Sequence, residues 1–217
     1  MTKSQTKLVL EAARTFIAAE SRAVLEVADQ LDETFVRVAS LLLDGEGKVI
    51  LTGAGTSGFI ARRAAHLLSV SGTPAFYMNP TDGLHGSMGA VRKNDVMIAL
   101  SKGGSSGEVN ELAERVQGEG VIVVALTFSP DSRLHQLADI PVVLRPYLPA
   151  DPGGLIAMGS TLAHSAWLDA MALVLMRARQ YSWSRVHYTH PGGAVGSRTV
   201  LPAALDPLRI PHSAEPA

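Results

Sequence analysis

The 217-residue sequence contains no cysteine, which excludes disulfide bonds and thiolate metal sites. Its 19 basic and 20 acidic residues nearly cancel, to a net charge of -1, so the composition favours neither nucleic acid nor a membrane surface as a partner. No window approaches the roughly 20 apolar residues that a membrane-spanning helix needs. The N-terminus lacks the apolar core of a signal peptide, and we therefore expect a cytoplasmic protein.

Apolar side chains, by contrast, are plentiful and arranged for a folded core. They make up 47% of the chain against 18% charged residues, a balance typical of a globular domain. Short apolar runs of strand type occur at 48–52, 75–78, 95–100, 121–127 and 141–145, and stretches with helical spacing lie between them. This alternation predicts a three-layer α-β-α sandwich around a five-stranded parallel sheet, of the doubly wound, flavodoxin-like kind.

Other segments flank or interrupt this alternation. Residues 1–43 have apolar side chains at three- and four-residue steps and are expected to be helical. Residues 161–179 form a long, mostly apolar helix, which predicts packing against the domain or a second subunit. Residues 79–91 are expected to be a loop. Residues 201–217 contain four prolines and are expected to be a loosely ordered tail, so that residues 1–200 form a single domain.

The first glycine-rich turn, GAGTSG from Gly53 to Gly58, matches the G-x-G-x-x-G spacing of dinucleotide-binding folds. Such folds also need an acidic residue about 20 positions on, at the end of the second strand, to bind the ribose hydroxyls. The segment at that position, GTPAFYMNP, contains no acid, and the next one is Asp82. The missing acid disfavours a nicotinamide cofactor.

A second turn, SKGGSSGE, follows the third expected strand and is again rich in glycine and serine. Backbone N–H groups at a helix start, supplemented by hydroxyl groups, form a site for a phosphate dianion. The alternative is that these serines are ordinary N-caps. Two such turns after successive strands favour the ligand, and neither ends in the G-K-[ST] of a nucleotide P-loop. The expected contact residues are Gly55, Thr56 and Ser57 in the first turn and Ser101, Lys102, Gly104, Ser105 and Ser106 in the second.

Four segments, GAGTSGFIARR, SGTPAFYMNPTDGLHGSMG, LSKGGSSGE and HPGGAVG, together resemble the sugar isomerase (SIS) domain of arabinose-5-phosphate isomerases. The resemblance runs in order from about Lys48 to Ser197. It implies an aldose–ketose isomerase that acts on sugar 5-phosphates, needs no metal or other cofactor, and assembles as a tetramer. Members usually continue into a pair of CBS modules, so this chain resembles the short form without them.

The resemblance also implies site residues. The family's catalytic histidine in the HG loop falls on His85, its catalytic glutamate on Glu108 and its second histidine on His190. Its lysine in the first turn falls on Thr56, and its second turn is usually S-N-S-G-E, which this chain lacks. Lys102, in the facing turn, is a candidate to supply the missing charge. These departures suggest a different phosphosugar, or a domain that binds a phosphosugar without isomerising it.

The residue types suit this chemistry without the resemblance. Isomerisation through an enediol needs a base at the carbon acid and a second group that moves protons between the oxygens. Glu108 is the expected carbon base, while His85 and His190 share ring opening and oxygen-to-oxygen proton transfer in a division left open. A first-turn glutamate can equally serve the helix dipole. His85, His187 and His190 lack a recognisable metal-ligand spacing, and His164 is expected to be a packing or surface residue.

Overall fold

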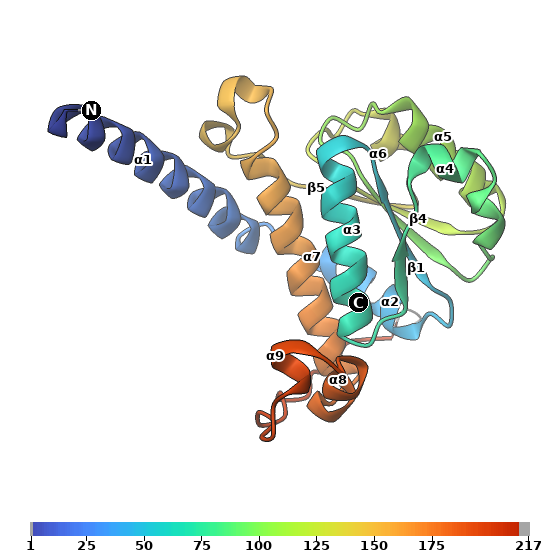
Figure 1. Ribbon diagram of the computed structural model, residues 1–217. Coiled ribbons are helices and arrows are strands. Elements are labelled where there is room, and N and C mark those ends of the chain that lie inside the picture. The colour runs from blue at the N-terminus through green and yellow to red at the C-terminus, as the bar shows by residue number, and fades with distance from the viewer. Residues whose placement is uncertain (1, 213–217) are drawn as a thin grey trace.

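Five strands form one parallel sheet in the computed structural model, which describes residues 2–212 (Figure 1). Their order across the sheet is β2-β1-β3-β4-β5, and every neighbouring pair is parallel. The strands are β1 (Val49–Gly53), β2 (Ala75–Tyr77), β3 (Val96–Leu100), β4 (Ile122–Thr127) and β5 (Ile140–Val143). The predicted five-stranded parallel sheet is confirmed.

Helices cover both faces of the sheet, because its central strands are apolar on both sides. Every residue of β1 and β3 is buried. In β1, Val49 and Leu51 belong to one apolar cluster and Ile50 to the other, as the two-residue period of a strand requires. The first cluster packs under α2 (Glu33–Asp44), α3 (Gly55–Val70) and α7 (Gly159–Ala178), and the second under α4 (Pro80–Leu84), α5 (Gly107–Gly118) and α6 (Arg133–Leu137).

The strand order creates a switch point between β1 and β3. The chain leaves β1 for β2 on one side and then crosses to β3 on the other side. In open α/β sheets, ligands bind outside the carboxyl ends of the strands at such a point. The two glycine- and serine-rich turns both begin there, because Gly53 is the register partner of Leu100 at the ends of the two strands.

The N-terminal helical segment is two helices rather than one. α1 (Lys3–Ala28) ends before a break, and α2 begins after Asp32, whose carboxylate accepts the N–H of Thr34 at 2.9 Å. Only Ala23 and Val27 of α1 are buried. α1 contacts α7, and its N-terminal end extends away from the sheet (Figure 1). No helix of residues 2–212 combines the length and the apolar character needed to cross a bilayer.

The loop expected at 79–91 contains regular structure. α4 and the 3₁₀-helix η1 (Ser87–Ala90) lie within it. Asn79 caps α4 by accepting the N–H groups of Thr81 and Asp82, and Pro80 occupies the first turn. These are ordinary helix-start signals, so the expectation of a plain loop was wrong.

The chain beyond α7 packs at the far end of that helix, away from the carboxyl edge of the sheet (Figure 1). It forms α8 (Trp183–Thr189), α9 (Gly193–Gly196) and then irregular chain to residue 212. Residues 201–212 form no helix or strand. They are nevertheless anchored, because Trp183 donates to the Ala203 carbonyl, Arg177 donates to the Asp206 carbonyl, and Ile210 packs on the core. The prolines expected in the tail include Pro216, and residues 213–217 lie outside the described part.

Candidate functional site

The two turns lie side by side at the carboxyl edge of the sheet. The first, Gly55–Ser57, opens α3, and the second, residues 101–106, leads from β3 into α5. α3 packs closely on β1 here, since a Cβ atom on Gly58 would lie 2.6 Å from the Gly53 carbonyl oxygen. The structure therefore brings together all the residues that we expected to bind phosphate, Gly55, Thr56, Ser57, Ser101, Lys102, Gly104, Ser105 and Ser106, on two adjacent strand ends.

The helix starts at these turns have no side-chain caps, although hydroxyl residues stand there. Neither Ala54, at the N-cap of α3, nor Ser106, at that of α5, makes a side-chain capping bond in the described part of the chain. Side chains do cap α1, α2, α4, α6 and α8, through Thr2, Asp32, Asn79, Ser132 and Ser182. Ser106, which occupies the N-cap position of α5, is therefore not an ordinary N-cap. The first N–H groups of α3 and α5 stay available to an anion.

Internal hydrogen bonds hold the second turn in shape. Ser101 is buried, its hydroxyl accepts the Gly104 N–H at 3.1 Å, and it lies 3.4 Å from the Ser106 hydroxyl. Ser105 donates to the Gly103 carbonyl at 3.1 Å. Gly104 has φ +62°, and a Cβ atom there would lie 2.1 Å from the Ser132 hydroxyl oxygen. Only glycine fits that position, so the sequence of the turn suits this conformation.

Lys102 supplies a cation at the second turn, and that cation is paired. Its Nζ lies 2.7 Å from Asp151 Oδ2 and donates to the Gly154 carbonyl at 3.0 Å. Burial alone would raise the pKa of the Asp151 carboxyl. The Lys102 ammonium and the Ser160 N–H stabilise the charged form, however, and hold that pKa below its ordinary value. Thr56, in the first turn, is exposed and uncharged.

Glu108 and His85 lie on neighbouring elements of one face. Glu108 is half-buried in the first turn of α5, and His85 is exposed at the end of α4. The two helices pack together through Gly83, where a Cβ atom would meet the Leu112 side chain at 2.8 Å. Both α4 and α5 follow strands that end at the same edge of the sheet. The structure thus gathers two of the three expected catalytic residues near the turns.

His190 lies elsewhere. It ends α8, and its Nδ1 is 2.7 Å from the Val186 carbonyl oxygen. The segment that leads to α8 attaches at Gly72, just beyond the end of α3, where the Tyr181 ring packs. α3 has 16 residues, about 24 Å at 1.5 Å per residue, and separates this point from the first turn. Within one chain, α8, which His190 ends, therefore lies beyond the amino edge of the sheet, whereas α5, whose first turn contains Glu108, begins at the carboxyl edge (Figure 1).

Two buried ionisable residues near the second turn were not expected to belong to the site. Asp151 is one of them. The other is His164 on α7, which stacks on Phe128 with ring centroids 4.6 Å apart. His164 is 1% exposed, and burial lowers its pKa to about 3 against an opposing attraction from Asp151. Of the two expected alternatives, a packing or a surface residue, His164 is therefore a packing residue. It stays neutral at physiological pH. The turn signal at Pro152 and the following glycines could have drawn attention to Asp151.

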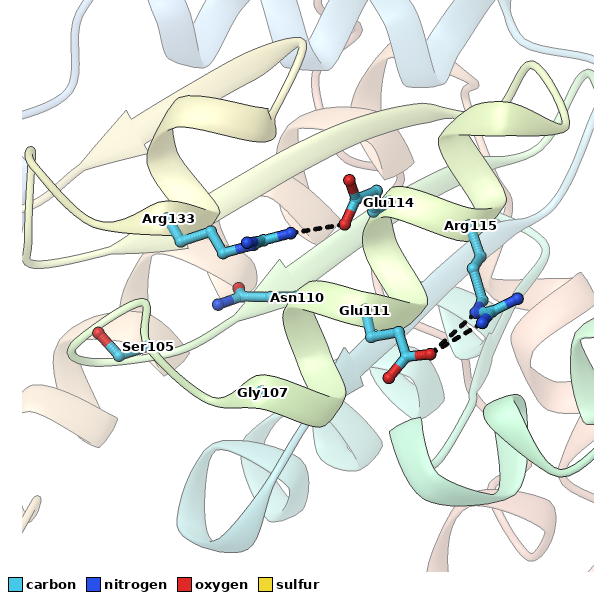
Figure 2. A pocket seen from close by; sticks show the side chains of 7 residues that line it. All are labelled: Ser105, Gly107, Asn110, Glu111, Glu114, Arg115 and Arg133. Carbon is cyan, nitrogen blue, oxygen red and sulfur yellow. Dashed lines mark hydrogen bonds and ion pairs between the residues drawn. The ribbon is translucent and has the colours of Figure 1, made fainter.

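A cleft of about 670 Å³ opens on the outer side of α5 (Figure 2). Two ion pairs stand in its wall: Glu114 with Arg133 at 2.7 Å, and Glu111 with Arg115 at 2.9 Å. Each cation is thus balanced, and the cleft offers little net charge to an anion. It is lined by Ser105, Gly107, Asn110, Glu111, Glu114, Arg115 and Arg133, a set without His85, Glu108 or the first turn. Between residues 2 and 212, no cluster of three His, Cys, Asp or Glu side chains is arranged to hold a metal.

A family model described as SIS domain matches residues 42–173. The arabinose 5-phosphate isomerase KdsD of Pseudomonas aeruginosa is 33% identical over 201 residues, 93% of this chain and 62% of that protein. The arabinose 5-phosphate isomerase GutQ of Escherichia coli K12 is 32% identical over 193 residues, 89% of this chain and 60% of that protein. The chain thus spans about three fifths of the length of these curated relatives.

A solved structure is similar over its whole length. The E. coli CFT073 protein c3406, in complex with arabinose 5-phosphate, superposes with a TM-score of 0.82 at 29% identity. The match covers 88% of this chain and 100% of that one. The fold and the order of the elements that carry the two turns are therefore shared with a sugar-phosphate complex.

Proposed function

This chain belongs to the SIS domain family, and on that premise we propose that it is an aldose–ketose isomerase of sugar 5-phosphates. The default pair is D-arabinose 5-phosphate and D-ribulose 5-phosphate, in line with the names of its relatives and the arabinose 5-phosphate complex. In this proposal residues 1–200 form one SIS domain, the protein is cytoplasmic, and no cofactor takes part. None is needed to balance the reaction, because C1 is reduced as C2 is oxidised within one molecule.

The observation that carries this proposal is the pair of uncapped helix starts on adjacent strand ends. The N–H groups of α3 and α5 converge on the switch point without side-chain caps, beside the hydroxyls of Ser57 and Ser106. A helix N-terminus attracts an anion through its open N–H groups and its dipole. A phosphate dianion held there leaves the sugar chain to extend toward α4 and α5.

In the proposed mechanism, Glu108 removes the proton from C2 of the open-chain aldose while O1 gains a proton. The product is an enediol with a double bond between C1 and C2. Loss of the O2 proton and return of a proton to C1 complete the ketose, so atoms and charge balance. His85 and His190 are assigned to ring opening and to the oxygen protons, chemistry that suits imidazole near neutral pH.

A panel of four- to six-carbon phosphosugars, each incubated with the purified chain and analysed for its isomer, tests the activity. We expect conversion of at least one aldose 5-phosphate, with both directions reaching the same equilibrium ratio. The competing function is a phosphosugar-binding module without catalysis, which the loss of the first-turn lysine at Thr56 favours. Binding without conversion of any sugar in the panel would establish that alternative.

We propose further that the chain assembles as a homotetramer, and at least as a dimer. α1 exposes large apolar side chains along its length, among them Leu8, Ile17 and Leu25, each at least 60% exposed. A helix with so much uncovered apolar surface is stabilised by a partner. Sedimentation velocity at micromolar concentration should show a species larger than the monomer, and Ile17→Asp should shift it toward smaller species. A wild-type monomer would contradict the proposal.

The position of His190 makes the proposed site composite. Because His190 and Glu108 lie toward opposite edges of the sheet within one chain, a catalytic role for both requires the partner subunit's His190 beside Glu108. Glu108→Gln and His190→Asn should each abolish most activity. Mixing the two inactive proteins under exchange conditions should then restore up to about a quarter of wild-type activity, as expected for random pairing around a two-fold axis. Failure of proven mixed oligomers to regain activity would contradict the shared site.

A further inference from the structure

One buried carboxylate joins the second turn to the start of α7. Asp151 lies in the loop between β5 and α7 and is 2% exposed. Its Oδ1 accepts the N–H groups of Met158 at 2.9 Å and Ser160 at 3.0 Å, and its Oδ2 is 2.7 Å from Lys102 Nζ. The same side chain therefore holds a helix start and the only lysine of the two turns.

At α7, Asp151 takes the place of a local cap. Met158, at the N-cap position of α7, makes no side-chain capping bond. The open N–H groups of Met158 and Ser160 are instead accepted by the carboxylate of Asp151, which lies seven and nine positions earlier in the sequence. These N–H groups and the helix dipole offset part of its negative charge. The Lys102–Asp151 pair together with the α7 start therefore keeps a net attraction for an incoming anion.

Hydrogen bonds and an ion pair hold both the backbone and the side chain of Lys102. Its carbonyl oxygen accepts the Thr127 hydroxyl at 3.2 Å and the Phe128 N–H at 3.1 Å, which ties its backbone to the end of β4. An ammonium group has three N–H donors. Within residues 2–212, one of them donates to the Gly154 carbonyl, and Asp151 Oδ2 faces the ammonium as an ion pair. The Lys102 side chain is 27% exposed, so the ammonium is within reach of solvent.

We propose that Asp151 is a positioning residue for phosphate recognition, which holds the Lys102 ammonium so that its remaining N–H binds the phosphate of the sugar. A lysine that is already held loses less conformational freedom when the ligand arrives. Lys102 thereby supplies, from the second turn, the cation that is absent at Thr56. The inference rests on the proposed function for the class of ligand, a phosphosugar. It does not require turnover, because it concerns binding affinity alone.

Calorimetric titration of the full chain with arabinose 5-phosphate, and separately with inorganic phosphate, tests it. Lys102→Met should weaken both ligands about tenfold or more, the usual scale of a hydrogen bond to a charged group. Asp151→Asn should weaken them several-fold, and Asp151→Glu should recover part of the loss. In the double variant the loss should not exceed that of Lys102→Met, because Asp151 acts through the lysine. In steady-state kinetics of an active isomerase, these substitutions should raise KM and leave kcat unchanged.

Asp95 provides a matched control at the opposite edge of the sheet. It too is 2% exposed, pairs with a lysine (Lys48 Nζ, 3.1 Å) and accepts two backbone N–H groups, those of Lys48 and Arg92, at 2.8 Å each. Asp95→Asn should therefore cost comparable stability and leave both affinities unchanged.

Several results would overturn the inference: equal losses in Asp95→Asn and Asp151→Asn, additive losses in the double variant, or tighter binding by Asp151→Asn, which would make Asp151 a competitor of the phosphate. If Asp151→Asn does not fold, an unchanged affinity of Lys102→Met overturns it as well. A wild-type chain that binds both ligands but isomerises no sugar contradicts only the proposed function. A wild-type chain that binds neither ligand contradicts both.

Discussion

Glu108→Gln should lower kcat for phosphosugar isomerisation by a factor of about 10² to 10⁴, the usual contribution of a general base. Glutamine keeps the shape and the hydrogen-bonding oxygen of the side chain but cannot take a proton from carbon. The half-buried position in the first turn of α5 brings this carboxylate beside the second turn, where it stays accessible to solvent. Steady-state rates with the best sugar of the panel measure the effect, which should appear in kcat more than in KM.

Glu111, one turn further along α5, is the matched control. It is also a surface-facing glutamate on the same helix, and it pairs with Arg115 at 2.9 Å on the outer side of α5 (Figure 2). Glu111→Gln should leave kcat within about twofold of wild type, since an exposed helix ion pair stabilises by only about 0.3–0.5 kcal/mol. Comparable rates for Glu108→Gln and the wild type would remove Glu108 from the mechanism. Equal losses in the two variants would point to a general effect on α5.

Folding stability should fall as the pH is lowered from 6.5 toward 4.5, and His164 should account for a large share of the loss. Burial lowers the pKa of His164 to about 3, whereas the ordinary value in an unfolded chain is 6.5. Below pH 6.5 the unfolded chain gains a proton that the folded chain refuses, so the stabilisation is complete above pH 6.5 and is lost toward pH 3. Between pH 6.5 and 4.5 this amounts to about 2 kcal/mol.

Denaturant unfolding of wild type and His164→Leu at several pH values isolates that contribution. Leucine fills the space on Phe128 without a titrating group, and the Nε2 atom that it removes makes no hydrogen bond in the described part of the chain. The variant should lose about 2 kcal/mol less than wild type over this range. His66→Gln, at an exposed histidine on α3, should follow the wild-type profile. Parallel curves for wild type and His164→Leu would show that His164 titrates normally.

Local patterns in the sequence were enough to predict the sheet and most helices. The runs at Val49–Gly53, Val96–Leu100 and Ile122–Thr127 are apolar on both faces, which only a strand covered by helices on two sides permits. The break at Asp32 and the helix after Asn79 were missed because each capping residue lies inside a stretch whose overall composition indicates another structure. The composition indicates continuous helix around Asp32 and a loop after Asn79. In both places, a single capping residue decides the conformation against the surrounding trend.

The site was only partly predictable, because the missing information is long-range. The two turns could be paired in advance, since parallel strands end at the same edge of the sheet. Lys102 finds its partners in a loop up to 52 positions later, and nothing local to Lys102 specifies the buried carboxylate that receives it. A catalytic role was predicted for His190 from its sequence motif, but the position of His190 in the fold depends on where α7 ends. A helix of 20 residues carries the C-terminal segment to the other edge of the sheet.

The anchoring of the C-terminal stretch has a consequence for the order of folding. Arg179 donates to the Leu42 carbonyl across 137 positions, and His212 lies 2.9 Å from Asp44 across 168 positions. The end of α2, an early element, is therefore completed by residues made much later. During synthesis, the contacts of α2 with α7 and with residue 212 cannot form until those later segments have emerged. Contacts of such high sequence separation also slow folding, so we expect the end of α2 to be completed late.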